Sequence, residues 1–448
     1  MKKYNVPPGY SFIQSIPRTY KQVKDPIGSM EESMRRYDGT YSVMLGSGKF
    51  IVTQNPAFID YVLRGNHRNF EKSPIQTKQL GRFLGNGLLT SNGEYWLKQR
   101  RLIQPGFHSE RIRGLYEIIR RTVDEAIDKI PVQQEVDVYP LMNTLAFELV
   151  INTLFNVNVP DAIRKELAAL IYELQDYVIR DVRQVYKRWW FRLSGEDSLH
   201  VRKSQRVREI IRGMILERKA TSNKFHDLLD MLMEAKYEDN GEHMTDDQLI
   251  DEITILIIAG HETTANALAW TMYLLAKHPE VQDHLREEAS SCNVSEAVTS
   301  DYINSVIRES MRLYPPAWIS DRISMSDDTF GGYDIPAGTI MVLFYYGLHR
   351  DAKHWTDPLA FRPERFLKEN YDRQKSKAYY PFGAGPRLCI GNNFALAEMT
   401  IFLQRLLPRK RMIPGTHRPE VVPLVTLKPD RIVLSLEAIG GASSHARE

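Results

Sequence analysis

The residues best suited to chemistry lie in one short stretch near the end of the chain, from Pro381 to Gly391. Three glycines surround Cys389 there, and a good helix-forming run begins at Asn392. Glycine lets peptide N–H groups approach a ligand closely, and a helix N-terminus places partial positive charge beside a cysteine, which favours the thiolate. The stretch therefore predicts an anionic sulfur ligand at position 389. The alternative is a glycine-rich turn that holds an inert buried cysteine.

A second group of polar residues, from Ala259 to Thr264, interrupts an apolar run. Burying Glu262 and Thr263 costs free energy unless each has a partner or a purpose. The small residues Ala259 and Gly260 would let a flat ligand approach the backbone. The pattern therefore predicts a polar site inside a helix. The alternative is that the Thr263 hydroxyl bonds the carbonyl four residues earlier and bends the helix.

This polar group lies in the middle of a long predicted helix. Thr245 and Gln248 have capping-box spacing, and His278 followed by Pro279 ends the apolar run. Such a helix has about 32 residues and, at 1.5 Å per residue, is about 48 Å long, enough to cross a domain and line a cofactor site. His261, inside the polar group, has no partner at a metal-binding spacing. We therefore expect it to face away from the cofactor.

Two pairs of residues at helical spacing are further candidates. Trp96 and Arg100 are four residues apart and share a helix face, where an indole and a guanidinium can grip one carboxylate. A solvated basic helix is the alternative. Glu309 and Arg312 share a face of a helix predicted from Asp301 to Leu313.

The stretch around Cys389 resembles the haem-binding loop of the cytochrome P450 superfamily. The family pattern Phe-x-x-Gly-x-Arg-x-Cys-x-Gly is matched by Phe382, Gly385, Arg387, Cys389 and Gly391. The resemblance implies that the Cys389 thiolate is the axial ligand of the iron of heme b, where it favours O–O bond cleavage. It also implies the family fold, a mainly α single domain with small β-sheets over residues 1–448.

Further motifs match the family in the same order and imply roles for this chain. Thr263 would hydrogen-bond the bound dioxygen, and Glu262 would feed protons to it through water. Glu309, Arg312 and Arg365 would form a charged cluster that locks the cysteine loop to the core. The other implied cofactor-binding positions are Trp96, Arg100 and Arg322 for the haem propionates, Phe382, Arg387 and Gly391 in the loop, and Ala259 and Gly260 on the long helix. A surface arginine is the alternative for Arg322.

No Ser/Gly-rich linker, low-complexity tract or repeat divides the chain. We predict a small β-rich region from about 35–65 and 317–345, and a helical bulk from about 90–313 and 390–408. The segment 69–89 has no clear period and should be a loop, which in the resembled family roofs the substrate pocket.

Composition limits the class of protein. A formal net charge of +3 over 448 residues gives no field that would attract nucleic acid. The chain has two cysteines, Cys292 and Cys389, which excludes a disulfide framework and fits a reducing compartment. Residues 1–9 lack the apolar core of a signal peptide or membrane anchor. We expect a cytoplasmic monomer of the soluble bacterial type, without an integral membrane segment.

The resemblance implies a haem-thiolate monooxygenase that inserts one atom of O₂ into a C–H bond of a small organic substrate, by hydroxylation or oxidative O-dealkylation. We expect no fused reductase, so electrons should come from a ferredoxin or flavodoxin with an NAD(P)H-dependent reductase. A basic face that includes Lys98, Arg405 and Arg409 could steer such a donor, and a solvated basic edge is the alternative. Two other functions stay open, a peroxide-driven peroxygenase and a non-catalytic haem-binding sensor; both would tolerate loss of Glu262 and Thr263.

The substrate pocket expected by family analogy takes Ile258, Ala259, Thr263, Ala317, Trp318, Leu424 and Val425. Several of these are apolar, which suits fatty acids, terpenes or other lipophilic compounds. Trp318 keeps a methylated sugar open as a substrate for demethylation, because aromatic rings also stack on sugar faces. The segment 186–193 mixes aromatic and basic residues. A peripheral membrane contact is conceivable there, but packing as a lid with the basic groups in water is favoured.

Overall fold

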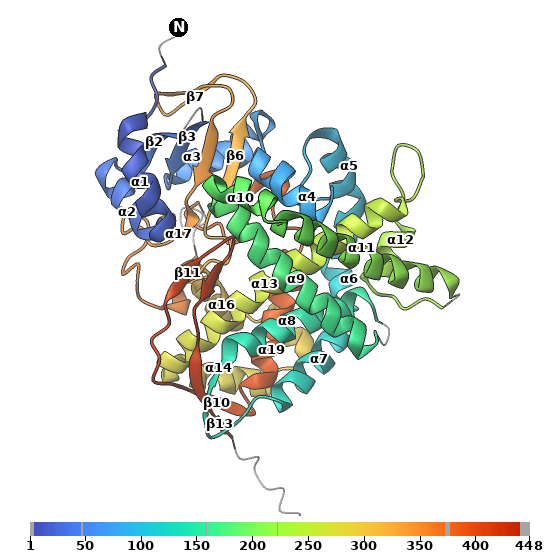
Figure 1. Cartoon of the computed structure of the whole chain (residues 1–448). Helices are drawn as coiled ribbons and strands as arrows, with labels where there is room; N and C mark the ends of the chain where they lie inside the picture. The colour runs from blue at the N-terminus through green and yellow to red at the C-terminus, as the bar shows by residue number, and fades with distance from the viewer. Residues whose placement is uncertain (1–3, 46–47, 157–158, 222, 372–376, 440–448) are drawn as a thin grey trace, which may run out of the picture.

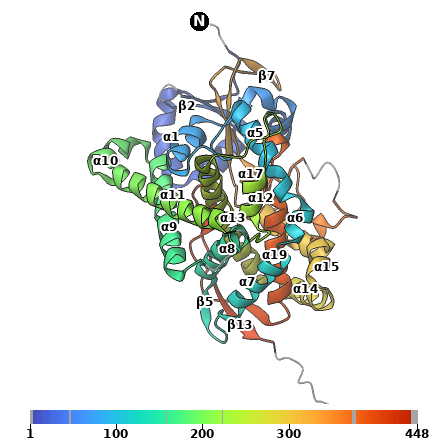
Figure 2. The ribbon, with the colours of Figure 1, turned by 90° about the vertical axis from the view of Figure 1, so that its right-hand side faces the viewer.

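The computed structural model describes residues 4–45, 48–156, 159–221, 223–371 and 377–439, and Figure 1 shows a mainly helical body with small sheets. The helices gather around α13 (Asp246–Lys277), which crosses the middle of the molecule. The largest sheet lies at the end that carries the N-terminus. A smaller sheet with β10 (Lys410–Pro414) and β13 (Val433–Ala438) lies at the opposite end (Figures 1 and 2).

Helix α13 begins and ends where the sequence predicts. The Thr245 side chain accepts the Gln248 N–H, and the Gln248 side chain accepts the Thr245 N–H, so the capping box is complete. Helices α8 (Val138–Leu154), α11 (Glu196–Ala220), α16 (Asp301–Leu313) and α19 (Asn392–Leu406) all pack against it. Because neighbours cover most of its circumference, α13 is apolar on nearly all sides.

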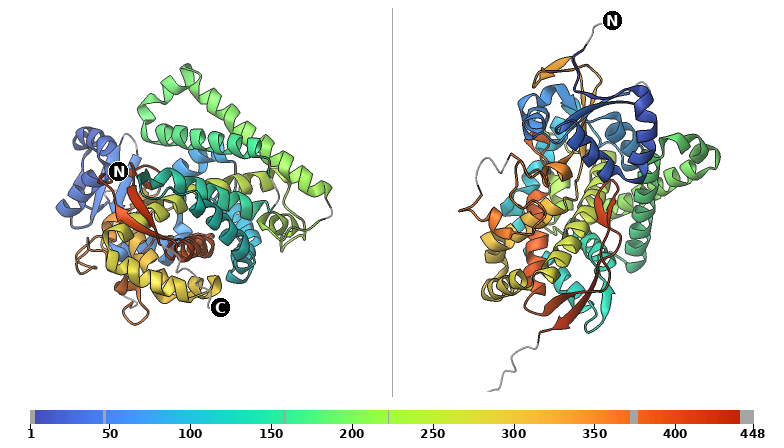
Figure 3. Two further views of the ribbon diagram at one scale, coloured as in Figure 1. Left: turned by 90° about the horizontal axis from the view of Figure 1, so that it is seen from below. Right: turned by 90° about the vertical axis from the view of Figure 1, so that its left-hand side faces the viewer.

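The other helices cover this central group. They are α1 (Phe12–Lys24), α2 (Pro26–Arg36), α3 (Pro56–Asp60), α4 (Gly81–Leu84), α5 (Gly93–Ile103), α6 (Ser109–Arg113), α7 (Tyr116–Asp128), α9 (Asp161–Arg183), α10 (Arg188–Leu193), α12 (Leu228–Glu234), α14 (Pro279–Ser291), α15 (Val294–Thr299) and α17 (Tyr345–Leu348). Figure 3 shows that α9 and α11 project from the body as a green hairpin with α10 at its tip.

One six-stranded sheet joins the two segments predicted to be β-rich. Its order is β1 (Gly9–Tyr10), β2 (Thr40–Leu45), β3 (Gly48–Thr53), β9 (Ile340–Leu343), β6 (Ser320–Ser324) and β4 (Phe70–Glu71). Strands β2 and β3 form the predicted antiparallel hairpin, although its turn at 46–47 lies outside the described residues. Strand β3 then pairs in parallel with β9, with Phe50 opposite Ile340.

Two small sheets lie outside the predicted β-rich segments. Strands β10, β13 and β5 (Glu135–Asp137) form one, and β11 (Val421–Pro423) and β12 (Leu427–Pro429) form a hairpin. A third small sheet, of β7 (Asp328–Phe330) and β8 (Tyr333–Ile335), lies inside the segment predicted from 317 to 345. The tip of the β11–β12 hairpin carries the predicted pocket residues Leu424 and Val425.

The prediction of a loop over 69–89 was wrong. The segment contains β4, a turn of π-helix at Ile75–Leu80 and the short helix α4. These pieces are too short for a helical period of 3.6 residues to emerge from the sequence, and tertiary contacts decide their conformation.

A fully buried arginine on α16 braces the fold on the side of the cysteine loop. Arg312 pairs with Glu309 through Nε to Oε2 at 2.7 Å and Nη2 to Oε1 at 2.8 Å. It also donates to the carbonyl oxygens of His349, Pro358 and Ala360. All five guanidinium donors therefore have acceptors, which is the condition for burying this charge.

This ion pair connects to two segments that precede the cysteine loop in sequence. Arg365 donates from Nε to Glu309 Oε1 at 3.2 Å, so the structure brings the three predicted residues together. Burial lowers the pKa of His349 to about 3, so its neutral ring can accept the Tyr380 N–H at 2.9 Å. Tyr380 directly precedes the loop, and the cluster therefore fixes where the loop begins.

Replacing Arg312 by Met should strongly destabilise the protein. The Glu309 carboxylate would stay buried without its main partner, which costs about 3–5 kcal/mol. Urea unfolding followed by circular dichroism measures the loss. Lys353→Met is the matched control, because its ion pair with Asp38 is exposed and should contribute nothing measurable. Equal unfolding midpoints for the two variants would contradict this account of the cluster.

Candidate functional site

Cys389 lies in a tight loop directly before α19. Its N–H donates to the Phe382 carbonyl oxygen at 3.0 Å, and the Leu388 N–H donates to that of Gly385 at 3.0 Å. Gly385 has a φ of +69°, and a Cβ there would overlap the carbonyl oxygen of Leu63. Glycine is therefore required at this position by both backbone conformation and space.

Trp96 and Arg100 of α5 share a helix face, but their side chains meet different groups. Arg100 donates from Nη1 to the Leu388 carbonyl oxygen at 2.8 Å, so it holds the cysteine loop. The Trp96 ring lies under the Arg387 guanidinium, 3.9 Å from carbon Cζ to the ring centroid. Sequence spacing predicted a shared face and could not predict that the long Arg100 side chain reaches a loop carbonyl.

The acidity of the Cys389 thiol depends on its surroundings. Burial raises its pKa, and the Gly391 N–H and the Arg100 guanidinium lower it by less. The helix terminus offsets little of this effect of burial, because its influence falls off beyond the first turn, and the thiolate stays a prediction. Cys389 precedes the first residue of α19, Asn392, by three positions. A metal cation would reverse this balance.

The middle of α13 has one open side. Ala259 is exposed although its helix is largely buried. Gly260 instead faces α8, where a Cβ would lie 3.0 Å from Val150. The prediction of a ligand-facing residue is therefore wrong for Gly260 and stays a prediction for Ala259. Successive helix residues point about 100° apart. His261 also turns to α8, with Nε2 2.8 Å from Oδ1 of Asn143, and burial lowers its pKa to about 4.

Glu262 is linked to the β11–β12 hairpin. The Thr426 hydroxyl donates to Glu262 Oε1 at 2.7 Å and accepts from Nδ2 of Asn266 at 2.9 Å. Burial raises the pKa of Glu262, while the Thr426 bond and the charge of Lys428 lower it by less. Family analogy places the tip that carries Thr426 at the pocket, but the sequence did not predict this bond to Glu262, since a lone threonine in a strand turn carries no motif.

The Thr263 hydroxyl donates to the Ala259 carbonyl oxygen at 2.8 Å, which is the alternative that the sequence left open. A hydroxyl in this geometry can still accept a hydrogen bond and can rotate to another acceptor. The next residue, Thr264, is buried and donates to Glu398 Oε2 on α19 at 3.1 Å. Burial raises the pKa of Glu398 well above its ordinary value.

Three cations gather where β6 and the cysteine loop approach the segment after β4. Lys72 and Arg322 are both buried. Burial and then the charges of Arg387 and Arg322 lower the pKa of Lys72, and burial with Arg322 lowers that of Arg387 to about 10. Neighbouring positive charges that lower the pKa values of buried cations favour an anion at this place. The sequence gave no signal for Lys72, a lone lysine in a segment predicted as loop.

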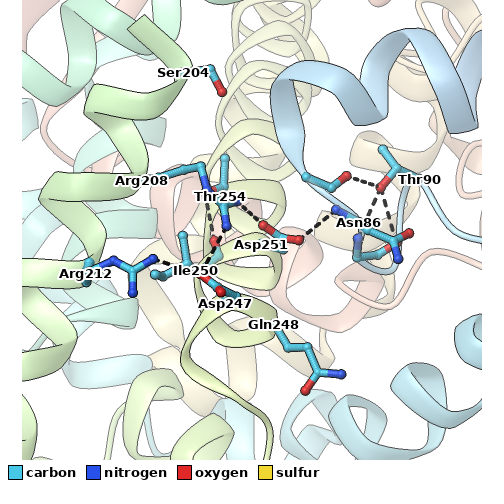
Figure 4. A network of polar contacts seen from close by, with 12 residues as sticks. Asn86, Thr90, Ser204, Arg208, Arg212, Asp247, Gln248, Ile250, Asp251 and Thr254 are labelled. Atoms are coloured by element: carbon cyan, nitrogen blue, oxygen red, sulfur yellow. Dashed lines mark hydrogen bonds and ion pairs between the residues drawn. The ribbon is translucent and has the colours of Figure 1, made fainter. Parts of the chain in front are cut away.

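Helix α13 also holds the segment predicted to roof the pocket, as Figure 4 shows. Asp251 Oδ2 accepts the Asn86 N–H at 2.8 Å, and its other oxygen pairs with Arg208 of α11. Gly85 has a φ of +84°, and a Cβ there would overlap the Asp251 carboxylate. One carboxylate therefore joins three elements of the roof.

The predicted pocket residue Trp318 points away from open space. Its ring is buried in a core cluster with Phe344, and its Nε1 donates to the Leu424 carbonyl oxygen at 3.0 Å. Successive residues of an extended segment face opposite sides, so the turn of Trp318 into the core leaves Ala317 on the other side. Ile258, Ala317 and Leu424 are half-buried and Val425 is exposed.

The predicted basic face is partly neutralised. Lys98 pairs with Asp239 at 2.7 Å, and both Arg405 and Arg409 pair with Asp124 at 2.8 Å. Ion pairing with carboxylates shortens the reach of a positive field. Composition alone therefore overstates the positive charge of this face.

A family model for cytochrome P450 matches residues 5–436. The chain belongs to the cytochrome P450 family. Cyclooctat-9-en-7-ol 5-monooxygenase of Streptomyces melanosporofaciens is 30% identical over 399 residues, which covers 86% of this chain and 85% of that protein. Cytochrome P450 4ae1 of Drosophila melanogaster is 31% identical over 412 residues, 86% and 82% of the two chains. The crystal structure of the cytochrome P450DA heme domain shares the fold, with a TM-score of 0.86 over 98% of both chains at 22% identity.

This cytochrome P450 is a monooxygenase by family, with heme b as its cofactor, and its residues fit that group. Cys389 is enclosed by protein atoms yet keeps exposed surface, and Ala259 is exposed although its helix is largely buried. Both statements hold if the sulfur and the methyl group line an internal space. A sulfur ligand, an apolar wall and buried cations for two carboxylates suit a haem. Within the ranges described above, no helix is long and apolar enough to cross a membrane.

The free energy of unfolding of this cytochrome P450 should depend on pH because of Glu252. This residue is buried on α13 beside Asp251. Its Oε2 accepts the Leu88 N–H at 3.0 Å, and burial raises its pKa to about 7. A carboxyl whose pKa is higher in the folded than in the unfolded protein stabilises the fold when the pH is below the unfolded pKa. This stabilisation is lost as the pH rises through the folded pKa. From about pH 5 to about pH 8, the wild type should lose roughly 2–3 kcal/mol relative to Glu252→Gln.

Urea unfolding at both pH values measures this difference. Glu94→Gln, a change at an exposed residue of α5, should show no such pH dependence relative to the wild type. Parallel stability curves for wild type and Glu252→Gln would show that this carboxyl titrates normally.

Proposed function

We propose that this cytochrome P450 inserts one atom of O₂ into a C–H bond of a lipophilic small molecule. Attack at a carbon that bears an ether oxygen would give O-dealkylation by the same chemistry. The observation that carries the proposal is the buried Glu262 carboxyl beside Thr263, one helical turn from the exposed Ala259. Heme b, held through Cys389, supplies electron transfer and O–O bond cleavage. The chain itself supplies protons, orientation and exclusion of water.

Glu262 holds the proton that the reaction needs. Because burial raises its pKa, the carboxyl stays protonated at a higher pH than an exposed glutamate. Its Oε1 accepts the Thr426 hydroxyl at 2.7 Å, and its Oε2 accepts Nε2 of Gln175 at 3.5 Å. From this carboxyl the proton moves through water to Thr263, whose hydroxyl turns away from the Ala259 carbonyl to pass a proton on.

The cluster of Lys72, Arg322 and Arg387 binds the two carboxylates of heme b in this proposal. The lowered pKa values of Lys72 and Arg387 support it, because a bound anion would offset the repulsion that Arg387 and Arg322 exert on Lys72 and that Arg322 exerts on Arg387. Trp96 braces the Arg387 side chain from below. Arg100, Phe382 and Gly391 hold the sulfur loop rather than the carboxylates.

Lys72→Met should speed the loss of heme about tenfold, because a charge-assisted hydrogen bond contributes roughly 1.5–3 kcal/mol. Transfer of heme to excess apomyoglobin, followed by absorbance, measures the rate. Lys78→Met, at an exposed position of the same segment, should leave the rate unchanged. Heme retention as strong as in the wild type would rule out Lys72 as a carboxylate anchor.

Apolar side chains support a lipophilic substrate. Ile258, Ala259, Ala317 and Leu424 offer mostly apolar surface, and the name of the Streptomyces relative gives cyclooctat-9-en-7-ol as its substrate. The hypothesis of a methylated sugar as substrate depended on stacking against Trp318, and that ring is buried. Spectral titration with substrate libraries, scored by displacement of the iron-bound water, would identify the class.

Electrons arrive in this proposal from a ferredoxin or flavodoxin with an NAD(P)H-dependent reductase. The protein would work in the cytoplasm as a monomer, with residues 1–448 as one domain. The exposed Arg101 of α5 remains a candidate contact for an acidic donor, since Lys98 beside it is ion-paired.

Thr263→Val should uncouple the reaction in a system reconstituted with ferredoxin, its reductase, NADPH and a substrate found by titration. Product per NADPH should fall about 10²-fold while hydrogen peroxide rises, because a positioned proton donor contributes roughly 10²–10⁴-fold. Thr263→Ser keeps the hydroxyl and should restore coupling.

A second experiment tests Glu262 by changing Thr426, its hydrogen-bond partner. Thr426→Val removes a bond that lowers the Glu262 pKa, so the alkaline limb of the pH–rate profile should move to higher pH. Thr426→Ser should return it. Peroxide-driven turnover that is equal in wild type and Thr263→Val would favour a peroxygenase, and heme binding without any turnover would favour a sensor.

A further inference from the structure

A cleft lies outside the candidate site, between α12 and the turn that follows α5. Figures 1 and 2 both show α12 beside α5 and α6. The cleft has a volume of about 660 Å³, which lies within the range of small-molecule sites in proteins. The described residues that line it include neither those that hold the Cys389 loop nor those around Glu262. We call it the α5/α12 cleft, and the proposed reaction gives it no role.

The floor of the α5/α12 cleft is apolar and closely packed. Leu102, Leu115 and Leu228 line it and are buried, and Met231 of α12 lies half-buried among them. Met231 packs so closely on the turn after α5 that a Cβ on Gly106 would overlap its side chain. Such a floor exists before a ligand arrives, and a ligand tail that covers it removes apolar surface from water.

Both ends of α12 are fixed by buried or half-buried bonds, so the cleft keeps its shape. Asp227 and Asp230, at the start of α12, both pair with Arg218 of α11. Asp230 also accepts two backbone N–H groups. After the helix, the Tyr237 hydroxyl accepts from Nε2 of Gln99 on α5 at 2.8 Å. The two aspartates that line the cleft are therefore already occupied.

Two of the cations on the rim of the cleft are also occupied. Lys98 pairs with Asp239 at 2.7 Å, and Lys224 pairs with Glu234 at 2.6 Å. Each pair combines one positive and one negative charge, so neither adds net charge to the rim. The remaining charged residues on the rim therefore decide which ligand the cleft attracts.

These remaining residues are mostly cations, and they come from three elements. Arg101 lies on α5, Arg111 on α6, and Lys236 shortly after the end of α12. All three are exposed, and none has an ion pair with another residue that the structure describes. Glu238 is the one carboxylate of the described rim that also lacks an ion pair. Three cations against one carboxylate favour an anionic ligand.

We propose that the α5/α12 cleft binds a small organic carboxylate with an apolar tail. The tail would cover Met231 and the leucines of the floor. The carboxylate would accept hydrogen bonds from Arg111 and Arg101, because a guanidinium can donate two parallel bonds to a carboxylate. This inference does not depend on the proposed reaction.

An acidic electron donor is a poorer occupant of the cleft. A globular protein can touch Arg101 on the rim, but a specific protein interface covers a broad patch of about 800 Å² on each partner. Such a surface would span the opening and leave Met231 below it without contact. A narrow molecule with a charged head and an apolar tail complements both the rim and the floor.

The Met231 methyl group provides a direct probe of the floor. The holoprotein would carry ¹³C in its methionine methyl groups, and Met231→Leu would assign the signal. Clotrimazole bound to the heme iron would fill the substrate pocket, so that added decanoate meets only other sites. We expect decanoate to shift the Met231 signal in a saturable manner. Decylamine has a similar tail and the opposite charge, so it should bind about tenfold more weakly.

Two matched variants test the charge of the rim, and a third fills the cleft. Arg111→Gln should weaken decanoate binding about tenfold, because it removes a charge-assisted hydrogen bond. Arg113→Gln changes an exposed arginine of the same helix that does not line the cleft, and should bind as the wild type does. Ala235→Phe places a ring in the cleft and should abolish the shift. Reduced carbon monoxide spectra without clotrimazole would verify that each variant keeps its heme site.

Three results would overturn the proposal. The first is a Met231 signal that decanoate does not move; if an acidic ferredoxin moves it instead, the cleft belongs to a protein partner. The second is equal decanoate binding by Arg111→Gln and Arg113→Gln. The third is equal binding of decanoate and decylamine, which would show an apolar surface without recognition of charge.

Discussion

The fold depends on the buried ion pair between Arg312 and Glu309. A charge inside a protein is tolerated only when every donor and acceptor is satisfied, and here all five Arg312 donors have acceptors. His349 connects this ion pair to the cysteine loop. Its carbonyl oxygen accepts from Arg312, and its neutral ring accepts the Tyr380 N–H. The position of the sulfur thus follows from a charge that lies in another part of the sequence.

A second constraint comes from carboxyls that burial makes less acidic. Glu252, Glu262 and Glu398 lie on or against α13, and the pKa of each is raised. Their partners differ: a backbone N–H for Glu252, the Thr426 hydroxyl for Glu262 and the Thr264 hydroxyl for Glu398. A protonated carboxyl can be buried at lower cost than a carboxylate. The central helix and its neighbour α19 therefore carry several carboxyls that hold a proton to higher pH than an exposed glutamate does.

The capping box at Thr245 acts within a few residues, so local pattern predicted the central helix. Spacing alone predicted only that Glu309 and Arg312 share a helix face, and the family resemblance predicted their cluster with Arg365. Local patterns failed where side chains choose among distant partners. Trp318 turned to the Leu424 carbonyl, and Gly260 turned to α8. Lys72 as a site residue and the bond of Thr426 to Glu262 become visible only when segments far apart in sequence meet. The family pattern predicted the type of chemistry. Tertiary contacts determine which side chains lie beside the site residues and shift their pKa values.

The parallel pairing of β3 with β9 has a consequence for biosynthesis. Thr53 at the end of β3 meets Leu343, so about 290 residues must leave the ribosome before this edge is covered. At a translation rate of 5–20 residues per second, the hairpin waits roughly 15–60 s with one open edge. Such an edge invites pairing with other nascent chains. We expect chaperone protection of the N-terminal hairpin to matter more for yield of this protein than the final stability of its sheet.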